Sequence, residues 1–236
     1  MRREQPWSAS AQQFSGSVNN QMSAEQPKYF IFDLDGTLIN SLPDLLTAIN
    51  LLRSELALEP LTSNQVAQMV GDGATMLVRR ALGERYEDHL LQRFLDIYSE
   101  HLLDQTRCYP GIEDLLTRHN PQRMAVVTNK PVLYARKVLD GLNLSRFFAI
   151  VIGGDSCPHK KPHPYPVQYA LECIGAIPEQ TIMIGDHHTD LYAARGANIA
   201  TCFCAYGFGH CDDLVPDYQV HQPEDLVTLF PGATID

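Results

Sequence analysis

The sequence predicts an α/β fold with an open, mostly parallel sheet and an inserted helical cap domain. Short apolar runs recur along the chain, and most of the gaps between them hold helical patterns, as is typical of strands that alternate with helices. One gap, residues 43–109, carries only helical signals and is too long to be a simple crossover between neighbouring strands. We therefore predict that this segment forms the cap over the strand ends.

Length and composition limit the classes of protein to consider. The chain has 236 residues, of which 44% are hydrophobic and 19% charged, enough for one large domain or for a core with a smaller domain. With 18 Lys and Arg against 28 Asp and Glu, the formal net charge is -10. A nonspecific electrostatic grip on nucleic acid or on an anionic membrane surface is therefore not expected.

The cellular location is predicted from what the chain lacks. No apolar stretch approaches the roughly 20 residues needed to cross a bilayer, and the N-terminus has no apolar segment of the secretory kind. We therefore expect a cytoplasmic protein whose partner is a small molecule, with no membrane or nucleic-acid partner. Composition does not choose between a monomer and a homodimer.

The first 27 residues differ from the rest of the chain. They are rich in Ser, Gln and Asn and show no hydrophobic period, so they cannot bury enough apolar surface to offset the entropy lost on ordering. We predict a disordered N-terminal tail over residues 1–27. The catalytic core is then expected to comprise residues 28–42 and 110–236.

Five apolar runs are predicted as strands of the core. The first, residues 29–32, is continuously apolar and ends at Asp33-Leu34-Asp35, as expected for a buried parallel strand. The others cover residues 124–128, 149–152, 181–185 and 199–205. In such sheets the ligand binds outside the carboxyl ends of the strands, so the residues that follow each strand are the candidates for the functional site.

Several helices are predicted in the cap. Pro43 suits the first turn of a helix whose apolar residues repeat at helical spacing: Leu45, Ile49, Leu52 and Leu56. Thr62-x-x-Gln65 is typical of a capping box at the start of a short helix. Gly71 and Gly73 are expected to end that helix and Gly83 the next, and a longer helix is predicted from about residue 86 to 103.

Polar residues with distinct chemistry follow the predicted strands. In chain order they are Asp33, Asp35, Thr128, Asn129, Lys161, Asp186 and Asp190. Carboxylates that converge on one crevice repel each other unless a cation joins them, and a ligand set of oxygens favours Mg²⁺. A lysine and a hydroxyl beside such a cation suit a phosphoryl group. The set therefore predicts phosphoryl transfer with Mg²⁺ as cofactor.

A mechanism follows from the positions of these residues. Asp33, at the strand tip, is placed to attack phosphorus and form an aspartyl phosphate. Asp35 could protonate the leaving oxygen and then, as a carboxylate, activate the hydrolytic water. Thr128 would bind a phosphoryl oxygen, Lys161 would neutralise charge in the transition state, and Asp186 would hold Mg²⁺ together with Asp33.

These residues resemble, in order, the four motifs of the haloacid dehalogenase-like hydrolase superfamily. The matching segments are Asp33-Leu34-Asp35-Gly36-Thr37-Leu38, Thr128-Asn129-Lys130, Lys161-Pro162-His163-Pro164, and Gly185-Asp186 followed by Asp190. The similarity extends from residue 28 to about residue 209. Three further segments, 70–74, 151–155 and 160–164, are similar to the phosphoglycolate phosphatase subfamily.

The resemblance implies a Rossmann-like core, a helical cap inserted after the first motif, Mg²⁺ dependence and a small phosphomonoester substrate, with 2-phosphoglycolate favoured. It also implies that the main-chain carbonyl of Asp35 is a metal ligand and that Asn129 supplies a phosphate-binding amide. Two alternatives stay open. One is a sugar-phosphate phosphatase or a phosphomutase of the same superfamily, and the other is a catalytically weak phosphate-binding regulatory module.

Several residues near these motifs have two interpretations. Asp190 could cap the helix that follows it or pair with Lys161 in support of the site. In the cap, Asp72 is expected in a loop that faces the crevice, and Arg79 could reach a substrate carboxylate or be solvated on its helix. Lys160 is interpreted as a solvated charge.

Histidines and cysteines offer a second, weaker metal hypothesis. His187 and His188 adjoin the last motif, where the superfamily usually has Ser at the first of these positions, but adjacent loop residues point in different directions. Cys202-x-Cys204 with His210-Cys211 could bind zinc, although this spacing fits no common pattern and both cysteines fall on a predicted strand. We interpret most of the six cysteines as small core residues.

Overall fold

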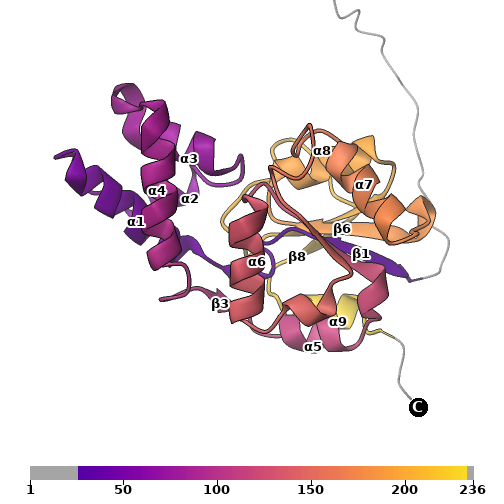
Figure 1. The fold of residues 1–236 in the computed structure, drawn as a ribbon. Helices are drawn as coiled ribbons and strands as arrows, with labels where there is room; N and C mark the ends of the chain where they lie inside the picture. Colours follow the sequence, from indigo (N-terminus) through magenta and orange to yellow (C-terminus); the bar gives the residue numbers. More distant parts are fainter. Residues whose placement is uncertain (1–25, 233–236) are drawn as a thin grey trace, which may run out of the picture.

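The computed structural model describes residues 26–232 of the chain, so the predicted tail lies outside the described residues except for its last two positions. A six-stranded sheet forms the centre of the molecule, in the order β5-β4-β1-β6-β7-β8 (Figure 1). Every neighbouring pair in it is parallel. The predicted α/β fold with a Rossmann-like parallel core is therefore confirmed.

The five predicted strands are all present, within one residue at each end. They are β1 (Tyr29–Phe32), β4 (Met124–Val127), β5 (Ile150–Ile152), β6 (Thr181–Gly185) and β7 (Ala200–Cys204). The sixth strand, β8 (Tyr218–Val220), was not predicted. Three residues at a sheet edge, with Gln219 exposed between two partly or fully buried neighbours, are too few for a periodic signal.

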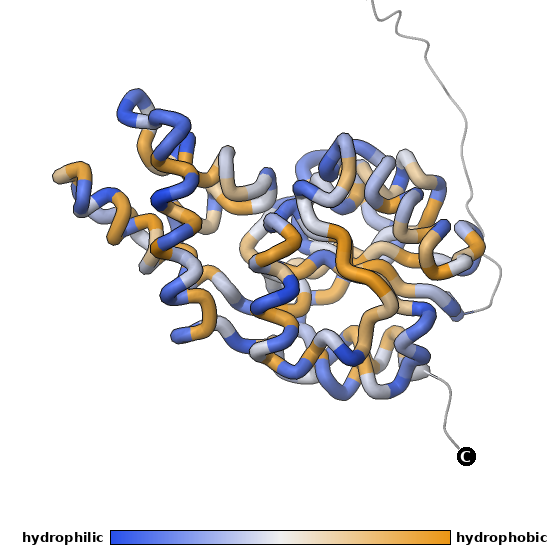
Figure 2. Tube along the Cα trace, viewed as in Figure 1, coloured by the Kyte–Doolittle hydropathy of each residue, from blue (hydrophilic) through white to orange (hydrophobic). Residues whose placement is uncertain are grey.

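Helices cover both faces of the sheet, because successive strand residues point to opposite sides. Ile31 of β1 packs with residues of α7 (Tyr165–Cys173) and α8 (His188–Gly196). Phe30 and Phe32 face the other way, toward α5 (Ile112–Thr117), α6 (Val132–Gly141) and α9 (Asp225–Leu229). In Figure 2 the hydrophobic colour is continuous along the central strands and interrupted along the helices.

Four helices stand beside the sheet, at its carboxyl end (Figure 1). They are α1 (Leu42–Glu55), α2 (Ser63–Ala67), α3 (Ala74–Leu82) and α4 (Asp88–Glu100). The chain enters and leaves them through two short antiparallel strands, β2 (Ile39–Asn40) and β3 (Arg107–Cys108). Short 3₁₀ turns in the described part of the chain cover Gly83–Arg85, Pro121–Arg123, Ser145–Phe147 and Pro178–Gln180.

Most of the helix starts and ends predicted in this helical segment agree with the structure. Thr62 accepts a hydrogen bond from the amide of Gln65, whose side chain accepts from the amide of Thr62, so the capping box is present. Gly83 ends α3 as expected. The short helix α2 ends at Ala67, however, earlier than predicted. Gly71 and Gly73, with φ of 115° and 88°, lie in the following loop, and Gly73 begins α3 instead.

The interpretation of the cysteines as core residues is correct for only two of the six. Cys202 and Cys204 are buried on β7, whereas Cys173 is exposed and the other three are half-buried. The two buried residues lie on a central strand, while the others lie on a short linker strand, a helix end and loops. Across residues 26–232, no helix combines the length and the apolar character needed to cross a membrane.

Candidate active site

A cavity of about 620 Å³, open to solvent, lies between the carboxyl ends of the strands and the helices α1, α3 and α4. The core side is lined by residues that follow β1, β4 and β6, including Asp33, Thr128 and Asp186. These strands are neighbours in the sheet, so their ends meet at one edge. The opposite wall is formed largely by apolar residues of the helical segment: Leu45, Val70, Ala74, Leu77, Phe94 and Leu95.

Lys161 joins Asp33, which lines this cavity, to the buried carboxylate of Asp190. Its Nζ donates to Asp33 Oδ1 at 2.8 Å, to Asp190 Oδ1 at 2.6 Å and to the main-chain oxygen of Val127 at 2.5 Å. Burial disfavours a charged lysine, but Asp190 and Asp33 outweigh this effect and raise the pKa of Lys161 above its usual value. The lysine is therefore a fixed positive charge beside Asp33.

The site holds more buried negative charge than positive charge. Burial raises the pKa of Asp33 from 3.8 to about 6, against the opposing effect of Lys161. Burial also raises the pKa of Asp186 well above its usual value, and the charges of Asp33 and Asp190 add to the rise. Three buried carboxylates share one lysine, an arrangement that a bound cation would relieve.

Asp186 is held by the loop that follows β7. Its Oδ2 accepts the amide protons of Phe208 at 3.0 Å and of Gly209 at 2.9 Å, and its Oδ1 accepts from the hydroxyl of Thr37 at 3.3 Å. The backbone of Gly36, with φ of 87°, passes so close that a Cβ there would lie 2.1 Å from the Asp186 carboxylate. Glycine is required at this position by both conformation and space.

The residues present fit a Mg²⁺ site. One carboxylate oxygen from each of Asp33, Asp186 and Asp190 lies within 4.8 Å of the others, and oxygen ligands are those that Mg²⁺ prefers. Asp190 already uses both of its oxygens, one for Lys161 and one for the amide of His187 at 3.0 Å. Asp190 thus caps α8 and pairs with Lys161 at the same time, which combines the two interpretations left open by the sequence.

Asp35 has partners that the sequence did not indicate. Lys130 Nζ donates to its two oxygens at 2.9 and 3.1 Å, and the hydroxyl of Ser41 donates to Oδ1 at 2.5 Å. Lys130 also donates to the hydroxyl of Tyr98 on α4 at 2.7 Å. Lys130 stands in the Thr128-Asn129-Lys130 motif, and that position was the one available signal for its role; nothing in the sequence signalled Tyr98.

Thr128 and Asn129 both line the cavity and are buried. The amide nitrogen of the Asn129 side chain donates to the carbonyl oxygens of Gly71 at 2.8 Å and of Lys161 at 2.9 Å. Its Oδ1 is buried and has no hydrogen-bond partner among the described residues. The side chain of Asn129 therefore connects the core to the loop before α3.

The structure does not bring Asp72 and Arg79 to the cavity wall. The carboxylate of Asp72 pairs with Arg80 at 2.5 Å, and this pairing outweighs partial burial and lowers the pKa of Asp72. Arg79 lies 3.7 Å from Asp88 and stacks over the ring of Tyr86, with its side chain 54% exposed. Lys160, interpreted from the sequence as solvated, instead donates to the main-chain oxygen of Asp72 and links core to helical segment.

His187 directly follows Asp186 and lines the cavity. It is buried, and this burial, aided by the neighbouring His188, lowers its pKa to about 4. A Cβ at Gly71 would lie 2.4 Å from its Nε2, so the ring packs against the loop before α3. His187 is therefore a neutral side chain at the contact between core and helical segment.

Comparisons with known proteins agree with this geometry. A family model described as haloacid dehalogenase-like hydrolase matches residues 30–204. Over 219 residues the chain is 36% identical to the phosphoglycolate phosphatase of Pseudomonas putida, covering 88% of this chain and 80% of that protein. Over 211 residues it is 33% identical to the phosphoglycolate phosphatase of Aquifex aeolicus, covering 89% and 99%. The crystal structure of a predicted phosphoglycolate phosphatase from Haemophilus somnus superposes with a TM-score of 0.78 at 29% identity, covering 88% and 99%.

Proposed function

Because this chain belongs to the haloacid dehalogenase-like hydrolase family and is a phosphoric monoester hydrolase, we propose that it hydrolyses 2-phosphoglycolate in a Mg²⁺-dependent reaction through an aspartyl phosphate. The observation that carries the proposal is the buried group of Asp33, Lys161 and Asp186, in which the two carboxylates line the cavity and Lys161 pairs with Asp33. It combines a nucleophile, a fixed positive charge and a set of oxygen ligands.

The carboxylates of Asp33 and Asp186, with the main-chain oxygen of Asp35, would hold the Mg²⁺ ion. When bound, the ion supplies positive charge that offsets the repulsion between the phosphoryl oxygens and the carboxylates. Asp190 would support the site through Lys161 without joining the ligands, because both of its oxygens are already engaged.

In the first step, a carboxylate oxygen of Asp33 attacks phosphorus and the bond from phosphorus to the leaving oxygen breaks. Asp35 in its protonated form gives its proton to that oxygen, and the alcohol leaves. In the second step, water attacks the phosphorus of the aspartyl phosphate, Asp35 accepts a proton from it, and Asp33 and inorganic phosphate are released. Lys161 and Thr128 would stabilise the charge on the phosphoryl oxygens in both steps.

The lining of the cavity favours binding of a small anionic substrate rather than a sugar phosphate. The amino end of α3, at Ala74, lines it and offers partial positive charge to a substrate carboxylate. The wall of the helical segment is largely apolar and offers few partners for the hydroxyls of a sugar. The relatives named phosphoglycolate phosphatase point to the same substrate.

A phosphate-release assay over a panel of monoesters, with Mg²⁺ or with a chelator, tests the proposal. We expect the highest kcat/KM for 2-phosphoglycolate, loss of turnover on chelation, and loss of turnover in Asp33→Asn. The exposed Asp213 provides the matched control, since Asp213→Asn removes the same charge outside the cavity and should behave like the native protein.

Each alternative has its own outcome in this assay. Isomerisation of a sugar phosphate would indicate a phosphomutase, and preferred release of phosphate from sugar phosphates would indicate a different phosphatase of the family. Binding of a phosphate analogue without hydrolysis of any monoester would indicate a regulatory module. Turnover that survives in Asp33→Asn would contradict the aspartyl-phosphate mechanism.

The remaining features of the proposal concern the whole protein. Residues 43–109 would act as a cap that controls entry to the cavity formed by residues 28–42 and 110–236. We place the enzyme in the cytoplasm, as a monomer or a homodimer, acting on a small molecule.

A further inference from the structure

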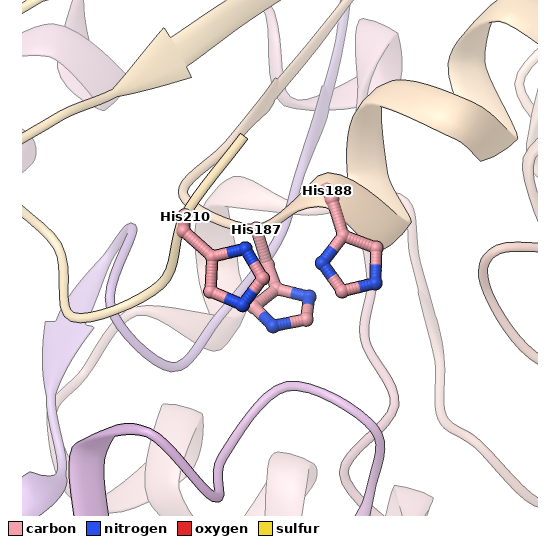
Figure 3. Close-up of side chains that lie close together, drawn as sticks. All are labelled: His187, His188 and His210. Carbon is pink, nitrogen blue, oxygen red and sulfur yellow. The ribbon is translucent and has the colours of Figure 1, made fainter. Parts of the chain in front are cut away.

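Three histidines gather beside the cavity, from two segments that are far apart in the sequence. His187 and His188 lie at the start of α8, and His210 lies in the loop after β7 (Figure 3). The centres of the rings are 4.1 Å apart for His187 and His188, 5.0 Å for His187 and His210, and 4.9 Å for His188 and His210. One ring nitrogen of each lies within 4.8 Å of the other two.

Two of these rings have polar neighbours on the Nδ1 side. His210 Nδ1 lies 2.8 Å from a carboxylate oxygen of Asp212, so the contact with Asp212 is on the Nδ1 side of the ring. His187 Nδ1 accepts the amide proton of Thr189 at 3.4 Å and lies 3.1 Å from the hydroxyl of the same residue, so Nε2 is the ring nitrogen available to a ligand. A carboxylate or hydroxyl behind the ring is the usual way in which proteins orient a metal-binding histidine.

His188 gives an independent sign that a ligand belongs here. Its Nδ1 is buried and has no hydrogen-bond partner among the described residues, and Asp212 Oδ2 lies 3.7 Å away, beyond hydrogen-bond distance. Buried polar atoms are nearly always paired, so an unpaired ring nitrogen that faces two further imidazoles calls for an explanation. A metal ion bound by all three rings supplies one.

We propose that His187, His188 and His210 form a second metal site, for Zn²⁺ or a similar transition metal, with Asp212 orienting His210. Imidazole nitrogens suit Zn²⁺, whereas Mg²⁺ prefers oxygen ligands, so this site and the carboxylate site select different ions.

A metal ion at this site would connect two segments that follow neighbouring strands, β6 and β7, at the carboxyl end of the sheet. His210 follows the segment whose amides, from Phe208 and Gly209, hold the carboxylate of Asp186. His187 and His188 begin the helix that follows Asp186. An ion bound by all three rings therefore joins the loop after β7 to the start of α8. Its role is structural, and we expect bound Zn²⁺ to raise the temperature of thermal unfolding.

Zinc titration in excess Mg²⁺ tests the proposal, because Mg²⁺ then occupies the carboxylate site. Isothermal titration of the native protein should give one Zn²⁺ per chain, and the double variant His188→Gln with His210→Gln should bind at least about ten-fold more weakly. A matched double variant, His89→Gln with His221→Gln, removes two histidines outside the cluster and should keep the native affinity. Asp33→Asn, which alters the Mg²⁺ ligands, should keep it too.

Two results would overturn the second site. One is native protein that binds no stoichiometric Zn²⁺ in excess Mg²⁺, and the other is a His188/His210 double variant that binds as tightly as the native protein. If the double variant does not fold, as judged by circular dichroism, His210→Gln alone decides the question, since that side chain is 58% exposed and its replacement leaves the core intact. Zinc affinity is measured without substrate, so its outcome is independent of the proposed hydrolysis.

Discussion

Asp35 is held by a lysine from the core that also reaches the helical segment. Lys130 donates to both Asp35 and Tyr98, and its side chain is only 4% exposed. Burial opposes the charge on Lys130, but the Asp35 carboxylate outweighs it and raises the pKa of the lysine. The position of the proposed acid and base therefore depends on a contact with α4.

Replacing Lys130 should separate positioning from binding. In Lys130→Met we expect kcat to fall about ten- to hundred-fold with a smaller change in KM, because Asp35 loses its orienting partner. Lys130→Arg should recover part of the loss. The control is Lys137→Met, since Lys137 also bridges core and α4, donating to Ser99 at 3.1 Å, but does not contact Asp35. Steady-state kinetics with 2-phosphoglycolate measures kcat and KM, and thermal unfolding of each variant checks that it is folded. Equal kcat in the two methionine variants would contradict the positioning role.

The raised pKa of Asp33 should be visible in the stability of the metal-free protein. The folded value, about 6, lies above the unfolded value of 3.8, so the group stabilises the fold below about pH 4 and this contribution is lost as pH rises through 6. Two pKa units correspond to about 3 kcal/mol. The stability of Asp33→Asn relative to the native protein should therefore increase by up to that amount from pH 4 to 7.

Urea unfolding in the presence of a chelator measures this difference across the pH range, and the comparison cancels the titration of groups that do not interact with Asp33. Repeating it with Mg²⁺ should flatten the difference, because a cation favours the ionised form of Asp33. A difference that does not change with pH would show that Asp33 titrates normally in the folded protein.

At the scale of the elements, a buried carboxylate joins the two segments through which the chain enters and leaves the helical segment. Asp44, at the start of α1, accepts the amides of Gln105 at 2.9 Å and Thr106 at 2.8 Å and the hydroxyl of Thr106 at 2.7 Å. Gln105 and Thr106 directly precede β3. The helix that opens the inserted segment is thus tied to the residues that close it.

We expect Asp44→Ala to lower the free energy of unfolding by about 3 kcal/mol, since it leaves two amides and a hydroxyl without an acceptor. Asp213→Ala serves as the control, because Asp213 is exposed and its replacement should change stability little. Equilibrium urea unfolding provides the measurement. Equal stability of the two variants would mean that water satisfies the linker amides once the carboxylate is removed.

The elements themselves were predictable to different degrees. Continuous apolar runs located the five longer strands, because a strand buried on both faces has no polar positions to interrupt it. The two-residue strands β2 and β3 and the edge strand β8 carry no such signal, since their pairing depends on residues far away in the sequence. The capping box of α2 was predictable because it is a purely local hydrogen-bond pattern.

At the scale of the whole molecule, the loop before α3 is a second place, besides α4, where the helical segment contacts the core. The carbonyl of Gly71 accepts from Asn129, and its Cα faces the ring of His187. Lys160 donates to the neighbouring Asp72. This contact between the helical segment and the core therefore depends on a glycine at position 71, where a side chain would meet His187 directly.

A pair of glycine variants tests whether this contact matters for catalysis. Gly71 and Gly83 both have positive φ, 115° and 54°, so alanine strains the backbone at either position, at a cost of about 1 kcal/mol or more. A Cβ at Gly71 would lie 2.4 Å from His187, whereas at Gly83 nothing lies within 4 Å. We expect kcat/KM to fall about ten-fold in Gly71→Ala and little in Gly83→Ala. Similar kinetics in the two variants would show that the contact does not limit catalysis.

The sequence alone determined the parallel core and the acidic and basic residues at the strand ends, because apolar runs and the residues that directly follow them are local features. Only the tertiary structure decided which of these residues share a partner. Lys130 lies 95 residues from Asp35 and 32 from Tyr98, and His210 reaches His187 from another strand end. Such contacts depend on how the helices pack against the sheet. The same packing turned Arg79 away from the cavity and brought Lys160 to the loop before α3.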